Sequence, residues 1–230
     1  MADLLAELGA ARRRWRFRGD PRGAHIAAMM RTRTIYVHVP KCGGKSIISG
    51  FYGLGVHDGF GHAEINLYRA LLGPRRFREY TKFTVMRDPI ARCLSAYHFG
   101  KRGGFGGKAD QGHAHTFATM SFEEFVLNGT LDTYFTRHTI FKPQAKFICG
   151  PDGAVLVDHI CRLETLEADL RAVLGRSFDH FEIPKMNMTD YDRSPSLDPA
   201  VINKLKDLYA RDYEILAQSR PVCAGRGDAA

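Results

Sequence analysis

The sequence has no apolar run near the roughly 18 residues that a membrane-spanning helix needs. Residues 1–10 contain Asp3 and Glu7 where a secretion signal would have a basic start. The five cysteines are odd in number and scattered, without the spacing of metal ligands, which argues against a disulfide framework and against a zinc site. We therefore expect a soluble, cytoplasmic protein that holds no metal.

Acidic residues are scarce near the start of the chain. Residues 11–33 contain eight arginines and a single acid, Asp20, so this segment carries +7 of the net charge of +8. We interpret residues 1–33 as a basic leader, solvated and partly disordered, with a helix over 3–15 and a loose connection through 19–23. A helix carrying Arg12, Trp15 and their neighbours would alternatively lie on an anionic membrane surface or contact nucleic acid.

The remainder of the chain is long enough for one well-filled domain. With 230 residues and 44% apolar content, two domains of ordinary size are not expected. We predict a single α/β domain over residues 34–218 and a mobile tail over 219–230. Within it the patterns predict a helix near 65–72, a strand over 154–160, and helices over 163–174 and 197–217. Ser121 and Glu124 have the spacing of a capping box.

The run Thr34–Ser49 reads as a buried strand, a glycine turn and the start of a helix. The strand is β-branched and aromatic, and Pro40 ends it. Gly43 and Gly44 allow positive φ and a close approach to a ligand, and the following helix would direct free N–H groups at that ligand. With Lys41, Lys45 and Ser46 beside them, this is a predicted anion site, and phosphate is the expected anion. A Walker A loop would need glycine at Val39, which disfavours an ATP-type P-loop.

A second strand-to-helix junction follows at residues 80–98. Phe83 and Val85 belong to a buried strand, Asp88 suits an N-cap and Pro89 the first helical position. Arg87 is thereby placed at the carboxyl end of a strand, where open α/β sheets bind ligands. Taken singly, Arg87 is explained as well by an ion pair with a nearby acid, and Ser95 as an ordinary hydroxyl on a helix surface.

Together the two junctions resemble a known family. Pro40-Lys-Cys-Gly-Gly-Lys-Ser46 is similar to the 5′-phosphosulfate loop of sulfotransferases that use 3′-phosphoadenosine 5′-phosphosulfate (PAPS), and Arg87-Asp-Pro-Ile-Ala-Arg-Cys-Leu-Ser-Ala-Tyr97 resembles their 3′-phosphate motif. The branch is that of carbohydrate 2-O-sulfotransferases and their bacterial relatives. The resemblance implies a three-layer, P-loop-like fold with a central, mostly parallel sheet between helices. Lys45 stands where the family usually has threonine.

The resemblance also implies roles for individual residues. Lys41, Cys42, Gly43, Gly44, Lys45 and Ser46 would hold the 5′-phosphosulfate, and Arg87 and Ser95 the 3′-phosphate. A Gly-His pair at a similar place in the family supplies the catalytic base, which nominates His62 here; Glu64 is the reserve. A histidine that titrates near neutrality suits this role, although a turn histidine bonded to backbone has the same sequence signature. The expected partners are PAPS and a hydroxyl on a sugar, lipid or small metabolite, with no metal and no nucleic acid.

Two other functions stay open. An ATP-dependent P-loop kinase would need an acid at a strand end, for which Asp158 is the candidate. A non-catalytic module would use the arginine-rich leader to contact nucleic acid or membrane, beside an inactive anion pocket. The residues that would select the acceptor, including the glycine-rich segment 100–116, have no readable signature.

Overall fold

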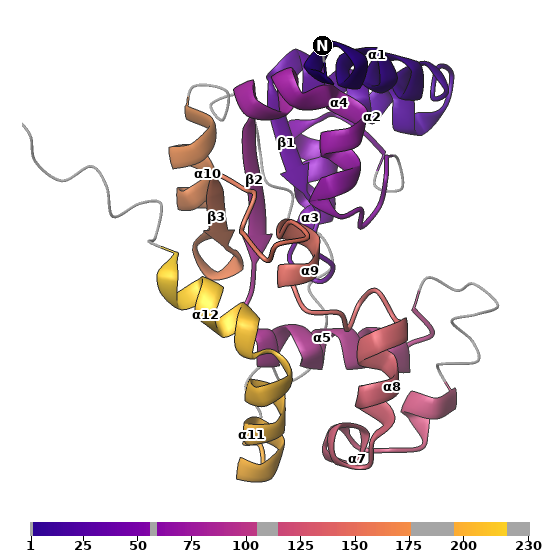
Figure 1. Cartoon of the computed structure of the whole chain (residues 1–230). Coiled ribbons are helices and arrows are strands. Elements are labelled where there is room, and N and C mark those ends of the chain that lie inside the picture. The colour runs from indigo at the N-terminus through magenta and orange to yellow at the C-terminus, as the bar shows by residue number, and fades with distance from the viewer. Residues whose placement is uncertain (1, 56–58, 105–114, 176–195, 220–230) are drawn as a thin grey trace, which may run out of the picture. The chain divides into compact units, whose positions relative to one another are not determined.

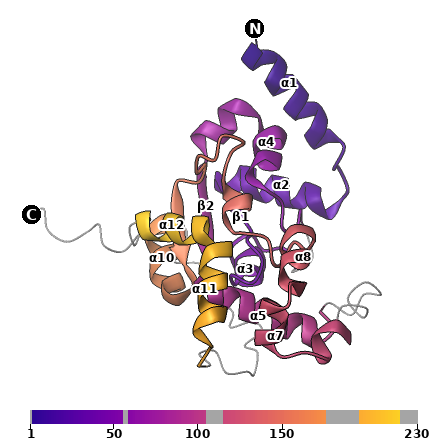
Figure 2. The ribbon, with the colours of Figure 1, turned by 60° about the horizontal axis from the view of Figure 1, so that its bottom comes forward.

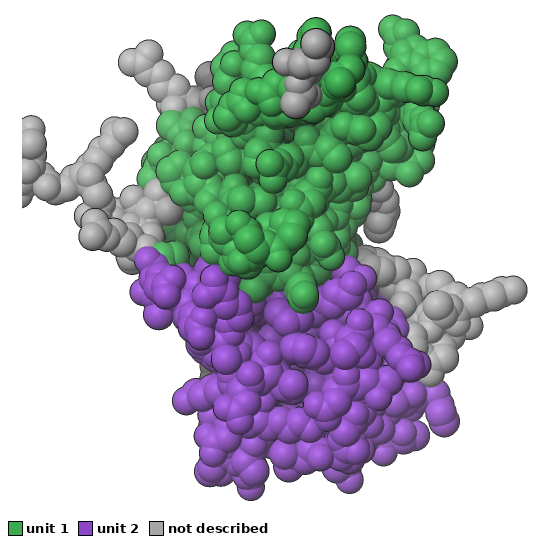
Figure 3. All heavy atoms as spheres, in the orientation of Figure 1, with its two compact units in different colours: residues 1–86, 145–186, 219–230 green, residues 87–144, 187–218 purple. Residues whose placement is uncertain are grey.

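The computed structural model describes residues 2–55, 59–104, 115–175 and 196–219. The chain divides into two units, shown in different colours in Figure 3. Unit 1 consists of residues 1–86, 145–186 and 219–230, and unit 2 of residues 87–144 and 187–218. The domain limits predicted at residues 33 and 218 are not tested by this division and stay predictions.

Unit 1 contains an open sheet of three parallel strands (Figure 1). The strands are β1 (Thr34–Val37), β2 (Thr81–Met86) and β3 (His159–Arg162), in the order β1-β2-β3. Tyr36 pairs with Phe83, and Val85 with Cys161. All of β1 and most of β2 is buried, as expected for parallel strands covered on both faces. The predicted α/β fold with a parallel sheet flanked by helices is confirmed.

The third strand lies later in the chain than predicted. Residues 154–160 were the expected strand, but pairing with β2 starts only at His159. Before that point the chain folds back on itself, because Gly150 N–H donates to the carbonyl of Ala154 at 2.8 Å and Val155 forms an isolated antiparallel bridge with Cys149. This local turn uses the residues that otherwise would have extended the strand.

The helices of unit 1 cover this sheet, with α2 packed on β1 and α10 on β3. They are α1 (Ala2–Trp15), α2 (Pro21–Thr32), α3 (Gly44–Ser46), a π-helix (Ile47–Phe51), α4 (Ile65–Glu79), α9 (Ala145–Ile148), a 3-10 turn (Leu163–Thr165) and α10 (Leu166–Leu174). None of the described helices is both long and apolar enough to cross a bilayer.

The start of the chain is more ordered than the sequence indicated. The helix expected over 3–15 is present as α1. The expected loose connection is shorter, because Asp20 caps α2 by accepting the N–H of Arg22 at 2.8 Å. Ile26 and Met29 on α2 are buried. The interpretation of this region as a solvated leader is therefore wrong for residues 21–32, where the apolar residues between the arginines pack against the sheet.

Helix α1 is bound to α4 by polar contacts. Arg13 Nε donates to the carbonyl of Ala70 at 2.7 Å. Helix α4 is kinked at Gly73, which has a φ of 84° and is followed by Pro74. Just past the kink, the N–H of Arg75 donates to Glu7 Oε1 at 2.7 Å. Glu7 thereby acts as the cap for the second half of α4, since the first N–H groups of a helical segment have no partner within it.

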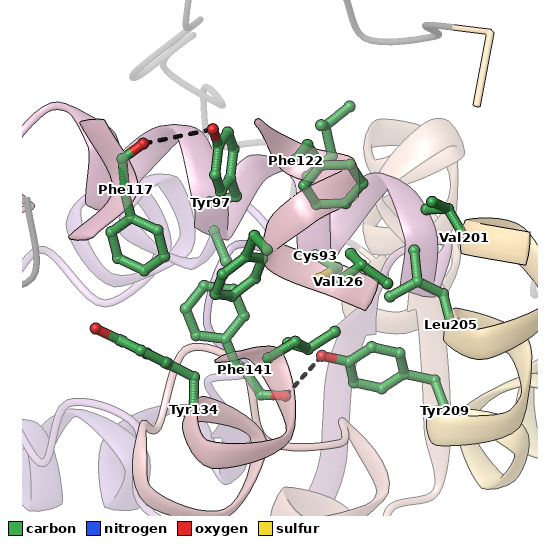
Figure 4. Close-up of a cluster of buried hydrophobic side chains, with 14 residues drawn as sticks. Cys93, Tyr97, Phe117, Phe122, Val126, Tyr134, Phe141, Val201, Leu205 and Tyr209 are labelled. Carbon is green, nitrogen blue, oxygen red and sulfur yellow. Dashed lines mark hydrogen bonds between the residues drawn. The ribbon is translucent and has the colours of Figure 1, made fainter. Parts of the chain in front are cut away.

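Unit 2 is helical and has its own core (Figure 4). It contains α5 (Pro89–Lys101), α7 (Phe122–Leu127), α8 (Thr130–Arg137), α11 (Pro199–Leu208) and α12 (Ala210–Gln218). Aromatic rings dominate the core, among them Tyr97, Phe125 and Phe141. The predicted capping box of α7 is confirmed. Ser121 Oγ accepts the N–H of Glu124 at 3.1 Å, and Glu124 Oε2 accepts the N–H of Ser121 at 2.7 Å.

The helix predicted over 197–217 is in fact two helices that meet at an angle (Figure 2). The break falls at Tyr209, which is buried and donates its hydroxyl proton to the carbonyl of Phe141 at 2.8 Å. Residues 105–114 of the glycine-rich segment 100–116 lie outside the described residues.

Candidate active site

The loop after β1 has an unusual backbone. Lys41 has φ of +67° and Gly43 has φ of +75°. Left-handed φ is natural for glycine but uncommon for lysine, and such residues concentrate at functional sites. Cys42 between them is fully buried, and its Sγ lies 3.5 Å from the carbonyl of Pro40. The sequence predicted the glycine turn, but it gave no indication that Lys41 shares its conformation.

A helix follows the loop, as predicted, and most of it is a π-helix. Three residues of α3 lead into the π-helix, which ends at Phe51; π-helical turns are often found at functional sites. Tyr52, next in the chain, ties this end back to β1. Its hydroxyl lies 2.9 Å from Thr34 Oγ1 and accepts the N–H of Tyr36 at 3.1 Å. The strand and the helix on either side of the loop are thus held together at their far ends.

His38 lies directly under the loop. A Cβ added to Gly44 would clash with the ring of His38, so any larger residue there would force this ring to shift. The His38 ring also stacks on Tyr36, with ring centroids 5.7 Å apart. Burial, reinforced by the nearby charges of His62, His25 and Lys45, holds the pKa of His38 well below its ordinary value. His38 was not among the predicted site residues, although its place directly after a strand was a usable signal.

His62 contacts His38, with ring centroids 4.3 Å apart. Its Nδ1 is 3.2 Å from the carbonyl oxygen of His38. A carbonyl only accepts, so Nδ1 carries the proton, and the lone pair of the neutral ring is on Nε2. The backbone bond considered for a turn histidine is therefore present, and it fixes Nε2 as the nitrogen that carries the lone pair. Glu64 is exposed at the N-cap position of α4, where its side chain makes no cap bond.

In unit 2, Arg87 is held by its backbone. The buried side chain of Gln144 accepts the N–H of Arg87 at 3.1 Å and donates to its carbonyl at 2.9 Å. The N–H of Gln144 in turn donates to Asp212 Oδ2 at 2.8 Å. Gln144 was not among the predicted site residues, and it lies 57 positions along the chain from Arg87. The side chain of Arg87 is left out of this bonding.

The ion pair considered for Arg87 is not found among the described residues. Asp88 instead caps α5, with Oδ1 accepting the N–H of Ala91 at 2.8 Å and Oδ2 facing the hydroxyl of Tyr213 at 3.3 Å. The N-cap predicted for Asp88 is confirmed. Ser95 is buried in α5, which does not match the surface hydroxyl considered for it. Arg87 and Ser95 belong to unit 2, whereas Lys41–Ser46 and His62 belong to unit 1.

Asp158, the candidate acid of a kinase, is bound to Lys82 on β2. Its Oδ2 accepts the backbone N–H of Lys82 at 2.8 Å and forms an ion pair with Lys82 Nζ at 2.9 Å. The pair joins β2 to the segment before β3. In the part of the chain that the structure describes, no three His, Cys, Asp or Glu side chains gather as metal ligands would.

A comparison with protein families agrees with this architecture. The model of the sulfotransferase family matches residues 25–217, which is most of the chain, so the protein belongs to the sulfotransferase family. Searches of curated proteins and of solved structures found no match. The resemblance seen in the two motifs is thereby confirmed for the family, and the roles of individual residues stay predictions.

Proposed function

We propose that this protein transfers a sulfuryl group from PAPS to an acceptor hydroxyl. Membership of the sulfotransferase family supports the reaction class. The observation that carries the proposal is the loop after β1, where the left-handed Lys41 is followed by Gly44 packed on His38, and His38 contacts His62. This loop combines a lysine with two glycines beside a histidine whose tautomer suits proton abstraction.

The donor would be held through its two anionic ends. The N–H groups of residues 42–46, with Lys41 and Lys45, would bind the 5′-phosphosulfate, because backbone N–H groups and lysines suit a phosphate without needing a metal. Arg87 would bind the 3′-phosphate with its planar guanidinium. Its side chain forms no hydrogen bond or ion pair with any described residue, which supports a ligand role. Ser95 would add its hydroxyl to the same phosphate.

The chemistry is an in-line displacement at sulfur. The acceptor oxygen forms the new S–O bond while the bond from sulfur to the bridging phosphate oxygen breaks, and that oxygen leaves with the electron pair. His62 Nε2 takes the proton of the acceptor hydroxyl. Lys41 stabilises the charge that develops on the leaving oxygen. The products are a sulfate ester and adenosine 3′,5′-bisphosphate, and the resemblance to carbohydrate 2-O-sulfotransferases favours a sugar hydroxyl as acceptor over a lipid or small metabolite.

The donor site is tested by calorimetric titration with adenosine 3′,5′-bisphosphate. Lys41→Ala and Arg87→Ala should each weaken binding by roughly 10- to 150-fold, the range for losing a hydrogen bond to a charged group. Lys206→Ala and Arg137→Ala remove the same side chains from exposed positions and should bind normally. Unchanged binding in both site variants would show the assignment to be wrong, and tighter binding of ATP–Mg²⁺ would favour the kinase.

The base is tested separately. His62→Ala should bind the bisphosphate as the unchanged protein does, but lose about 10²- to 10⁴-fold in turnover with labelled PAPS. If turnover stays near normal, His62 is not the base, and Glu64→Gln becomes the variant to measure.

A further inference from the structure

Helix α1 displays large apolar side chains to solvent. Seven large hydrophobic residues are exposed in the described part of the chain, and four of them are Leu4, Leu5, Leu8 and Trp15. Each of these four is between 59% and 67% exposed. Single exposed apolar residues are common on proteins, but their concentration on one short helix marks an interaction surface. We call these four residues the apolar stripe.

The apolar stripe faces away from the rest of unit 1. A helix turns by about 100° per residue, so Leu4, Leu8 and Trp15 fall within an arc of about 40°. Arg13, which binds the carbonyl of Ala70 on α4, and the buried Ala10 lie about 140° to 160° from the middle of this arc. Figure 2 shows α1 along the outside of this unit. Packing against α4 therefore leaves the apolar stripe uncovered.

The charges around the apolar stripe are positive. Arg12, Arg16 and Arg18 are exposed, and within the described residues none of them forms an ion pair. The two acids of α1 are directed elsewhere, since Asp3 lies 3.8 Å from Arg78 and Glu7 lies 3.5 Å from Arg76. The outer face of α1, together with the turn over residues 16–18 that follows it, thus combines leucines, the one tryptophan of the chain and arginines that form no ion pair with described residues.

We propose that the outer face of α1 binds the surface of an anionic phospholipid membrane. The apolar stripe would enter the boundary between headgroups and acyl chains, and the arginines would contact the phosphates, the arrangement of interfacial helices. Charge complementarity selects this occupant. A second copy of the chain would bring arginines against arginines, and a nucleic acid would leave the leucines in water.

The first test uses the unchanged protein, because Trp15 is the sole tryptophan and reports on its own surroundings. Its emission should shift to shorter wavelength with phosphatidylcholine vesicles that contain phosphatidylserine, and should stay unchanged with phosphatidylcholine alone. The shift should diminish as salt is added, since salt screens the arginines. No shift with the anionic vesicles would overturn the proposal, and so would an equal shift with both kinds.

The second test separates the two components by vesicle co-sedimentation. Each arginine near an anionic surface is worth about fivefold in binding, so Arg12→Gln/Arg16→Gln should bind roughly 25-fold more weakly. Leu8→Gln should also weaken binding. The matched controls are Arg102→Gln/Arg137→Gln and Leu127→Gln, which change exposed residues of unit 2 and should bind as before.

Two results would assign the surface to another partner and overturn the proposal. One is a dimer in analytical ultracentrifugation that Leu8→Gln dissociates. The other is binding to duplex DNA that the arginine variant loses, while Leu8→Gln leaves vesicle binding unchanged.

Discussion

Replacing Gln144 should both destabilise the protein and weaken the site at Arg87. The change Gln144→Leu keeps the size of the side chain but removes the two hydrogen bonds to the N–H and carbonyl of Arg87. The backbone bond from Gln144 to Asp212 remains. Each backbone group left without its partner costs about 1–3 kcal/mol. Arg87 is only partly buried, so water can bind part of the exposed backbone. We therefore expect the free energy of unfolding to fall by about 2–4 kcal/mol in total.

Urea denaturation followed by circular dichroism measures this loss, with Gln218→Leu as the control at an exposed position. Binding of adenosine 3′,5′-bisphosphate should weaken as well, because the backbone that carries the Arg87 side chain is no longer fixed. The reasoning is refuted if Gln144→Leu unfolds at the same urea concentration as the unchanged protein.

Two further predictions concern histidines in unit 1. Gly44→Ala places a Cβ against the ring of His38 and should reduce kcat about 10-fold or more, because displacements of about 1 Å are costly at reacting groups. Adding His38→Ala should restore part of the lost kcat. A kcat unchanged by Gly44→Ala would contradict the contact between Gly44 and His38. Burial lowers the pKa of His25 from 6.5 to about 4. Between these pH values the histidine is protonated in the unfolded state but neutral in the folded state. The free energy of unfolding therefore falls as pH decreases through this window, by about 3 kcal/mol in all. Denaturant titrations at several pH values should show a smaller fall for His25→Phe, and parallel curves for the two proteins would exclude His25 as the cause.

Features set by neighbouring residues could be predicted from the sequence. The N-cap at Asp88 and the capping box of Ser121 and Glu124 use side chains three positions from the groups they bind, so spacing alone reveals them. The strands β1 and β2 were equally readable, because both are rich in β-branched and aromatic residues.

Features that depend on distant partners could not be predicted. Gln144 binds Arg87 across 57 positions, and a lone glutamine has no pattern. The break at Tyr209 depends on the carbonyl of Phe141, 68 positions away. His38 is a nearer case, since its place after β1 was visible, but its contact with His62 required the chain between them to return to the same strand end.

The contact between Glu7 and Arg75 makes α1 part of the folded structure of unit 1. A chain shortened by α1 would lose the carboxylate that completes the restart of α4 beyond Pro74, and the carbonyl of Ala70 would lose its arginine partner. Such a truncation would destabilise the folded protein as well as remove the outer face of α1. Proteolytic loss of these residues in a preparation should therefore appear first as a lower melting temperature.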